Sequence, residues 1–313
     1  MDSVFDYVLT APLDETPIGS VADAWSRHRA VAQGFGTPMD AAIAGGFGAD
    51  RLGYAFLSGY QEAIWALIPG LAAEGLAAED MVAVSATETG GAHPAAIRTT
   101  LVQTGGVWTV RGTKTFTTLG AMARRLLVIT STGTDADGRN SLRAVLVPVD
   151  QSGVTVTDLP PIAFAPEIRH ATVTFADALG EPLPGDGYAD FLKPFRTIED
   201  AHVLAAALGW LVRIGRRAGW PRSTQQRLLA ALASLRGLDM SRPTSPGVHI
   251  ALGGLLEQVD RLIAELDWLW RLVDPVDSER WDRDRPLLST AGRVRALRLA
   301  TAWRAVGEPI DPE

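Results

Sequence analysis

The stretch WTVRGTKTFTT (Trp108–Thr118) indicates the class of structure in the middle of the chain. It is short and rich in Val and Thr, residues that favour strands. Five similar segments lie between residues 80 and 185, and turn-forming stretches such as DADGRNS separate them: MVAVSATE, RRLLVITST, LRAVLVPVD, GVTVTDLP and ATVTFADAL. Closely spaced short strands of this kind predict an antiparallel β-sandwich or barrel.

The regions on either side have a different periodicity. Residues 1–79 are rich in Ala and Gly, with apolar residues at helical spacing in DRLGYAFLSGYQEAIWALIPGL. Residues 186–313 predict a helical bundle, with helices over 191–219, 222–239, 246–273 and 285–306. The stretches GWP, SRPTSP and DPVDSERWDRD are expected to interrupt them. The fold class predicted is therefore α+β, with a β-domain at 80–185 between two helical regions.

Composition excludes several classes of function. The 313 residues carry a net charge of −7, which argues against a nucleic-acid-binding surface. There is no Cys, so disulfides and thiolate nucleophiles are excluded, and no metal site is predicted. The first residues, MDSVFDYVLTAPLDETP, do not have the pattern of a signal peptide. The longest apolar run, Val203–Val212, is too short to span a bilayer, so we expect a cytoplasmic protein with no membrane span.

A glycine loop follows the first predicted strand. In ETGGAHPAAIRTT, Gly90 and Gly91 allow the backbone to approach a phosphate closely, and their N–H groups could form an anion nest. Ala92 has no side-chain donor, whereas His93 could donate if it pointed inward. The alternative is a loop that only connects two strands.

Four segments, in order, resemble the acyl-CoA dehydrogenase family. They are GYQEAIWALIPGLAAEG, SATETGGAHPAAIRTT, WTVRGTKTFTTLG and TVTFADALGEPLPGDGYADF, and the resemblance covers about Gly59 to Gly209. It implies that family's fold, with a reduced N-terminal helical region, a central antiparallel β-domain and a C-terminal helical bundle. It also implies FAD as cofactor and an acyl-CoA thioester as substrate.

The resemblance also implies roles for individual residues. Thr87 would face the pyrimidine edge of the flavin, and Thr118 would lie near N5. Phe116 stands where the family usually has Trp, as an aromatic wall against the ring, and Ala92 stands at a Ser that adds a phosphate donor. A reduced flavin carries negative charge, so hydroxyl donors at its edge suit it. The alternative is that both Thr residues are ordinary strand residues and that Phe116 belongs to the core.

The family's catalytic base is a carboxylate that removes the α-proton of the substrate. Most members carry it near the C-terminus after a Gly-Gly-x-Gly-Tyr segment, which this chain lacks, so Glu308 and Glu313 are not assigned. Glu199 falls at the family's second location for this base. The alternative is that Glu199 and Asp200 are first-turn acids that favour the helix dipole.

A contact with the flavin of a neighbouring subunit is also typical of the family, in an Arg-x-x-Phe-Gly-x-Pro pattern. Arg217 and Trp220 fit its first part, Pro221 breaks the rest, and Gln225 and Gln226 are out of register. The apolar face of LLEQVDRLIAELDWLW predicts burial against another chain, in a homo-oligomer or a hetero-oligomer with a related dehydrogenase subunit.

Three functions remain open at this stage. The first is an FAD-dependent oxidoreductase that acts on the CH–CH group of an acyl-CoA, with a flavin site weaker than is usual in the family. The second is a catalytically impaired homologue, either the partner subunit of a hetero-oligomeric dehydrogenase or a scaffold without flavin. The third is a flavin monooxygenase of the same fold, which needs no α-proton base.

Overall fold

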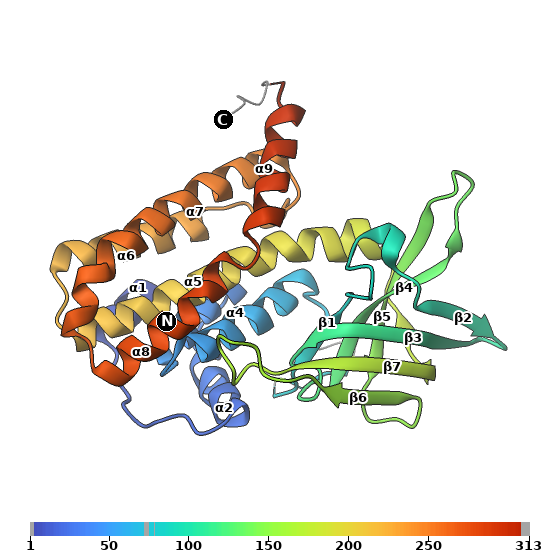
Figure 1. Cartoon of the computed structure of the whole chain (residues 1–313), viewed down its shortest axis with the longest axis horizontal. Helices are drawn as coiled ribbons and strands as arrows, with labels where there is room; N and C mark the ends of the chain where they lie inside the picture. The colour runs from blue at the N-terminus through green and yellow to red at the C-terminus, as the bar shows by residue number, and fades with distance from the viewer. Residues whose placement is uncertain (1–2, 72–74, 78, 308–313) are drawn as a thin grey trace. The chain divides into compact units, whose positions relative to one another are not determined.

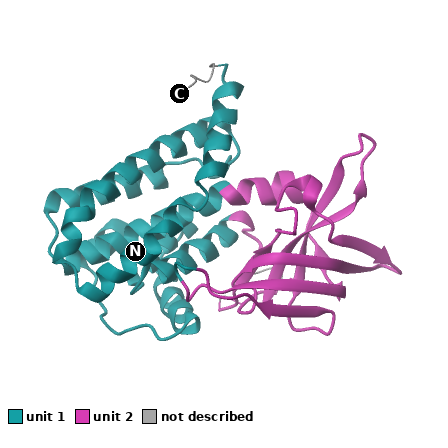
Figure 2. Cartoon of the chain, in the orientation of Figure 1, with its two compact units in different colours: residues 1–66, 163–165, 197–313 teal, residues 67–162, 166–196 magenta. Residues whose placement is uncertain are grey.

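A computed structural model describes residues 3–71, 75–77 and 79–307. Contacts between residues divide the chain into two compact units, shown in different colours in Figure 2. The helical unit comprises residues 1–66, 163–165 and 197–313, and the β unit comprises residues 67–162 and 166–196. The N-terminal and C-terminal helical regions of the sequence thus contribute to the same unit. Glu308 and Glu313 lie outside the described residues.

The β unit contains one curled sheet of eight strands, in the order β6-β7-β3-β2-β4-β5-β8 with β1 beside β4 (Figure 1). Most neighbours are antiparallel, as the sequence predicts. The exceptions are β1, which runs parallel to β4, and a single parallel pair between β2 and β4 at Thr100 and Ser131. The strands are β1 (Val82–Ser85), β2 (Thr100–Thr104), β3 (Val107–Thr118), β4 (Arg125–Thr134), β5 (Asn140–Pro148), β6 (Val154–Asp158), β7 (His170–Leu179) and β8 (Glu181–Pro182).

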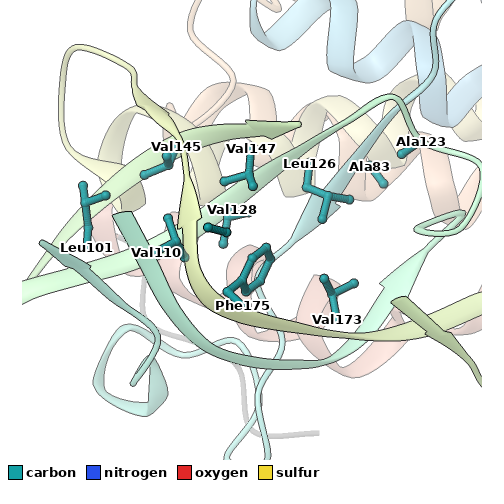
Figure 3. Packing of buried hydrophobic residues seen from close by; sticks show 11 residues of the cluster. Ala83, Leu101, Val110, Ala123, Leu126, Val128, Val145, Val147, Val173 and Phe175 are labelled. Atoms are coloured by element: carbon teal, nitrogen blue, oxygen red, sulfur yellow. The ribbon is translucent and has the colours of Figure 1, made fainter. Parts of the chain in front are cut away.

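One hydrophobic cluster fills the inside of the curl (Figure 3). Most of its members come from alternate positions of the strands, because successive side chains of a strand point to opposite faces. Most are β-branched or small, so they fit the closely spaced strands. They are Ala83, Leu101, Val110, Ala123, Leu126, Val128, Val145, Val147, Val173, Phe175 and Ala178.

A β-bulge interrupts the alternation near the end of β3. Lys114 is paired with Val173 and Thr117 with Ala171, so β3 contains one more residue than β7 over this interval. Lys114 and Thr117 are both fully buried, although they are three residues apart, whereas Phe116 is exposed. The Thr117 hydroxyl also forms a buried hydrogen bond of 2.7 Å with the hydroxyl of Ser85. The bulge therefore directs Phe116 outward while its neighbours stay in the core.

The helical unit is built from nine helices of the described chain, most of which begin at a Ser, Thr or Asp that accepts a hydrogen bond from the first turn. Helix α5 also contributes its first residues to the β unit. The helices are α1 (Val4–Thr10), α2 (Val21–Ala32), α3 (Pro38–Gly48), α4 (Leu52–Leu67), α5 (Lys193–Arg217), α6 (Arg222–Arg236), α7 (Pro246–Leu266), α8 (Pro275–Asp284) and α9 (Gly292–Ala305).

Glycine permits a close crossing of α3 and α5 inside this unit. A Cβ added at Gly46 would lie 2.0 Å from the carbonyl oxygen of Ala206, and one added at Gly209 would lie 2.3 Å from that of Ile43. Both distances are shorter than any real contact, and both neighbours are backbone atoms that cannot move aside easily. The Gly-rich helices thus pack within their own chain.

The sequence suggested that the stretch DPVDSERWDRD interrupts the helices. This prediction is wrong, because the stretch forms the helix α8. The Asp274 carboxylate caps it by accepting from the N–H of Val276, and Pro275 occupies its first turn, where the missing N–H costs nothing. Trp281 is only 1% exposed and stacks on Trp270 at 4.7 Å. One buried Trp therefore anchors a helix whose other residues are mostly charged.

The apolar face of α7 is buried within its own unit. Leu255, Val259, Leu262 and Leu266 are all nearly inaccessible. The inference that this face is buried against another chain is therefore wrong, because the helical unit already covers it. Among the helices of the described residues, none combines the length and the apolar character needed to cross a bilayer.

Candidate functional site

Three of the predicted flavin residues lie together in the β unit. Thr87 follows β1 and forms an isolated antiparallel bridge with Phe116 on β3. The N–H of Thr115 donates to the Thr87 carbonyl at 2.8 Å, which holds the two segments in register. Phe116 is 40% exposed, and Thr87 and Thr118 are half-buried. The end of β3 and Thr87, two residues after the end of β1, therefore form one patch with two hydroxyls and an aromatic ring.

His170, the first residue of β7, supports this patch. It lies opposite Thr118 in the sheet, and its Nδ1 is 3.2 Å from the Thr118 hydroxyl. Its ring stacks on Phe116 with centroids 4.1 Å apart and planes 23° from parallel. Burial lowers the pKa of His170 to about 4, so the imidazole is neutral at physiological pH. Sequence reasoning missed this residue, because only the strand register connects it to Thr118.

The glycine turn uses its backbone groups internally. The N–H of Gly91 donates to the Glu88 carbonyl at 2.7 Å, and the N–H of Glu88 donates to the Gly91 carbonyl at 3.0 Å. Gly91 has a φ of 93°, a conformation that other residues adopt only under strain. The turn thus explains why Gly is needed at this position. The Gly91 amide is engaged within the turn, and the role of Gly90 and Gly91 toward a phosphate stays a prediction.

A buried ion pair fixes the start of the same loop. Lys114 is fully buried, and its Nζ donates to Glu88 Oε1 at 2.7 Å and to the carbonyl of Ile129 at 2.6 Å. The Glu88 carboxylate also accepts from the N–H groups of Arg98 and Thr99, at 2.8 and 3.0 Å. Three backbone groups from two separate segments of the β unit therefore meet at one charged pair.

The two members of this pair respond to burial in different ways. Burial lowers the pKa of Lys114 to about 8, against the opposing effect of Glu88. Burial alone would raise the pKa of Glu88, but the hydrogen bonds from Lys114 and from the two backbone amides lower it below its usual value. The pair is charged at neutral pH, and we interpret it as a structural anchor.

The rest of the loop is held by further polar contacts. His93 is exposed, and its Nδ1 accepts from the N–H of Ala95, so this atom caps a short 3₁₀ turn, Pro94–Ala96. The carbonyl of Ala92 accepts from Arg196 at 2.9 Å, and Asn140 donates to the carbonyls of Pro94 and Ile97. His93 therefore does not point inward to replace the donor that Ala92 lacks.

Glu199 lies within α5, in the helical unit, and is half-buried. The alternative that Glu199 and Asp200 are first-turn acids is wrong, because α5 begins at Lys193 and is preceded directly by a π-helical segment at Gly187–Leu192. Asp200 is buried and forms ion pairs with Arg295 and Arg298 of α9. Asp200 thus has a structural role, and the role of Glu199 as a base stays a prediction.

Two of the residues near the predicted intersubunit contact, Arg217 and Trp220, have partners in their own unit. Arg217 forms an ion pair with Asp277 of α8. Trp220 is buried and meets Trp270 edge-on at 5.6 Å. Gln225 is half-buried, and its amide nitrogen and oxygen are buried with no hydrogen-bond partner among the described residues. These positions therefore give no support to the predicted contact with a second flavin.

The chain is similar to known proteins both in part of its sequence and in its architecture. Residues 83–178 match the family described as acyl-CoA dehydrogenase, middle domain. Glutaryl-CoA dehydrogenase from Mycobacterium smegmatis has a similar structure, with 14% identity, a TM-score of 0.65, and coverage of 99% of this chain and 94% of that chain. FMN-bound TdsC from Paenibacillus sp. A11-2 is 15% identical, with a TM-score of 0.68 and coverage of 94% and 98%. The FAD complex of PigA is 14% identical, with a TM-score of 0.67 and coverage of 92% and 90%.

At these identities the structural likeness shows the fold, and the middle-domain match covers most of the β unit. No curated protein matches the chain by sequence. The resemblance inferred from the four segments is confirmed at this level: residues 83–178 match the middle domain of acyl-CoA dehydrogenases, and the chain has the fold of the solved members of that family.

Proposed function

We propose that this chain is an FAD-dependent oxidoreductase of the acyl-CoA dehydrogenase type. The observation that carries the proposal is the patch formed by Thr87, Phe116 and Thr118, the three residues that the family resemblance implies for the flavin ring. The Thr87–Phe116 bridge and the β3 bulge bring them together on one surface of the β unit. Solved relatives of this fold hold FMN in TdsC and FAD in PigA, which supports a flavin as the ligand.

The residues present fit a flavin ring. Phe116 has one face against His170 and is 40% exposed, so a flat ligand could cover the exposed part. The half-buried hydroxyls of Thr87 and Thr118 could donate to ring atoms that gain negative charge on reduction. The flavin, when bound, supplies the two-electron acceptor. The chain contributes an aromatic surface and hydroxyl donors held by the sheet.

The proposed substrate is an acyl-CoA thioester, oxidised at its CH–CH group. In this reaction Glu199 would accept the α-proton of the substrate, and a bound flavin would supply the acceptor for the one hydride lost from the β-carbon. Glu199 is half-buried on α5, and its carboxylate is the group that the family resemblance implies for proton removal. We propose an oligomer, cytoplasmic in location, as the working form of the protein.

A second candidate is a homologue that serves as the partner subunit of a related dehydrogenase. The structure of the glycine turn favours it, because the Gly91 N–H is engaged within the turn and Ala92 has no side-chain donor. Such a subunit would bind flavin weakly by itself and more tightly with its partner. Two lost hydrogen bonds at about 1.5 kcal/mol each would weaken flavin binding on the order of a hundredfold.

Flavin titration of the purified chain tests the proposal. FAD and FMN are titrated separately, and binding is followed by the quenching of flavin fluorescence and by the melting temperature. We expect saturable FAD binding by the wild-type chain and weaker binding by Thr118→Val, which keeps the shape of the side chain but removes its hydroxyl. If neither flavin changes the fluorescence or the melting temperature at saturation, the chain alone has no working flavin site.

Catalysis is tested on the FAD-loaded protein with acyl-CoA and a chemical electron acceptor. Glu199→Gln keeps the size of the side chain and is expected to abolish flavin reduction without changing FAD affinity. Asp200 is not a suitable control, because it pairs with two Arg residues. The control variant is Glu257→Gln, at an exposed residue of α7. Full activity of Glu199→Gln would show that the base lies elsewhere.

A further inference from the structure

His170 is a polar side chain whose environment is only partly explained by the sheet. It is 7% exposed, and its Nε2 is buried with no hydrogen-bond partner among the described residues. Its Nδ1 contacts the Thr118 hydroxyl at 3.2 Å, and its ring supports Phe116. One imidazole thus contacts two of the three residues assigned to the flavin patch.

The neutral imidazole has two tautomers, and they place the hydroxyl proton of Thr118 differently. If the proton of His170 is on Nε2, then Nδ1 is an acceptor and the Thr118 hydroxyl must donate to it. If the proton is on Nδ1, then the imidazole donates to the oxygen of Thr118, and the hydroxyl proton remains available for another acceptor. The tautomer of His170 therefore decides whether Thr118 can donate to a ligand.

Burial distinguishes the two tautomers. With the proton on Nε2, a polar N–H would be buried without an acceptor, which native structures rarely tolerate. With the proton on Nδ1, the buried Nε2 has only an unused lone pair, and an under-satisfied acceptor is the less costly of the two. The Nδ1–H tautomer is thus the more stable one at this site.

We propose that His170 is a positioning residue for Thr118: its Nδ1–H donates to the hydroxyl oxygen, fixes its orientation and leaves its proton for a flavin acceptor atom. The role toward flavin rests on the proposed function, whereas the hydrogen bond itself does not. Stacking of the same imidazole against Phe116 fixes the aromatic ring at the same time. Both predicted flavin contacts on β3 then depend on one residue of β7.

The tautomer is measured directly in the flavin-free protein. The chain has five His residues, so long-range proton–nitrogen correlation spectra of uniformly ¹⁵N-labelled protein are simple, and the His170→Phe variant assigns the relevant signals. We expect the pattern of a neutral imidazole protonated on Nδ1. A pattern protonated on Nε2 would overturn the inference, whether or not the protein binds flavin.

A double-mutant cycle then tests the role toward FAD. His170→Phe keeps an aromatic ring beneath Phe116 but removes the donor, and Thr118→Val removes the hydroxyl. We expect His170→Phe to weaken FAD binding about three- to tenfold, the effect of one ordinary hydrogen bond, and to have no such effect in the Thr118→Val background. Melting temperatures of all four proteins show that each one is folded.

The outcomes separate the inference from the proposed function. If His170 carries its proton on Nδ1 but the wild-type chain binds no FAD, the hydrogen bond stands and the proposed function fails. If FAD binds and His170→Phe weakens binding equally in both backgrounds, then His170 acts through packing, and its positioning of Thr118 is overturned.

Discussion

The glycine turn at Glu88–Gly91 and the end of β3 at Phe116–Thr118 are joined through the Thr87–Phe116 bridge, yet they offer different groups to a ligand. In the turn, Glu88 and Gly91 exchange both of their backbone hydrogen bonds, and the Glu88 carboxylate is neutralised by Lys114. At the end of β3, an aromatic ring is exposed and a hydroxyl oxygen meets a neutral imidazole.

The difference shows how the two segments have to be interpreted. A glycine-rich sequence suggests free amides, but the amides bind an anion only if the turn leaves them unused. A Thr and a Phe in a strand suggest nothing special, but a bulge and a buried partner can turn them into a ligand surface. Substitutions in each of the two segments should therefore have different effects on stability and on flavin binding.

Removal of the Lys114 charge, which anchors the glycine turn, should have the largest effect on the stability of the protein. In Lys114→Met, the Glu88 carboxylate loses its cation while it remains buried, and we expect the free energy of unfolding to fall by about 3–5 kcal/mol. Urea unfolding measures it. Arg111→Gln is the matched control on the same strand, because Arg111 forms an exposed ion pair with Asp177 and should show no resolvable change. Equal losses in the two variants would refute the anchor role.

The imidazole of His170, on the strand next to β3, should make the stability of the protein depend on pH. Its pKa is about 4 in the folded chain against an ordinary value of 6.5, so its stabilising contribution is complete above pH 6.5 and is lost as the pH falls toward 4. The loss should be on the order of 2 kcal/mol, with some reduction for residual solvation. Urea unfolding at pH 7 and pH 4 measures it. The His170→Phe variant should lose less stability than the wild type between pH 7 and pH 4. Identical pH profiles of stability for the two proteins would contradict the lowered pKa of His170.

Truncation of the exposed ring should affect ligand binding more than stability. In Phe116→Ala, we expect FAD affinity to fall about tenfold, which corresponds to about 1.4 kcal/mol of lost stacking. Val107→Ala is the control, because Val107 is also an exposed apolar residue of β3 but lies at its other end. Flavin fluorescence titration measures both variants. Equal affinity of the Phe116→Ala variant and the wild type would place the flavin ring elsewhere.

Restoration of a hydroxyl in the glycine turn should have the smallest effect. In Ala92→Ser, we expect FAD affinity to rise less than about threefold, because the Gly91 amide beside it is already engaged and cannot join the new donor. Ala95→Ser introduces a hydroxyl on the exposed part of the same loop and serves as the control. Tightening of tenfold or more would mean that the turn contacts the flavin phosphates directly, and the contrast between the two regions would then be wrong.

The local sequence predicted much of the architecture. The Val- and Thr-rich segments identified six of the eight strands described in the β unit, because the side-chain pattern reflects which face of each strand is buried. They missed β2 and β8. The spacing of apolar residues identified most of the C-terminal helices. It missed α8, where a single buried Trp281 replaces an apolar face. The Thr87, Phe116 and Thr118 candidates came from the family resemblance, and the structure brings them together.

The sequence by itself thus determined most of the strands and helices and the four segments that resemble acyl-CoA dehydrogenases, because both depend on residues close together in the chain. Only the tertiary structure decided that Lys114 pairs with Glu88, that His170 lies under Phe116 and Thr118, and that the Gly91 amide is engaged. Each of these contacts depends on strand register or on a bulge. A shift of one residue in register moves a side chain to the opposite face of the sheet, and no local pattern records the long-range pairing that fixes it.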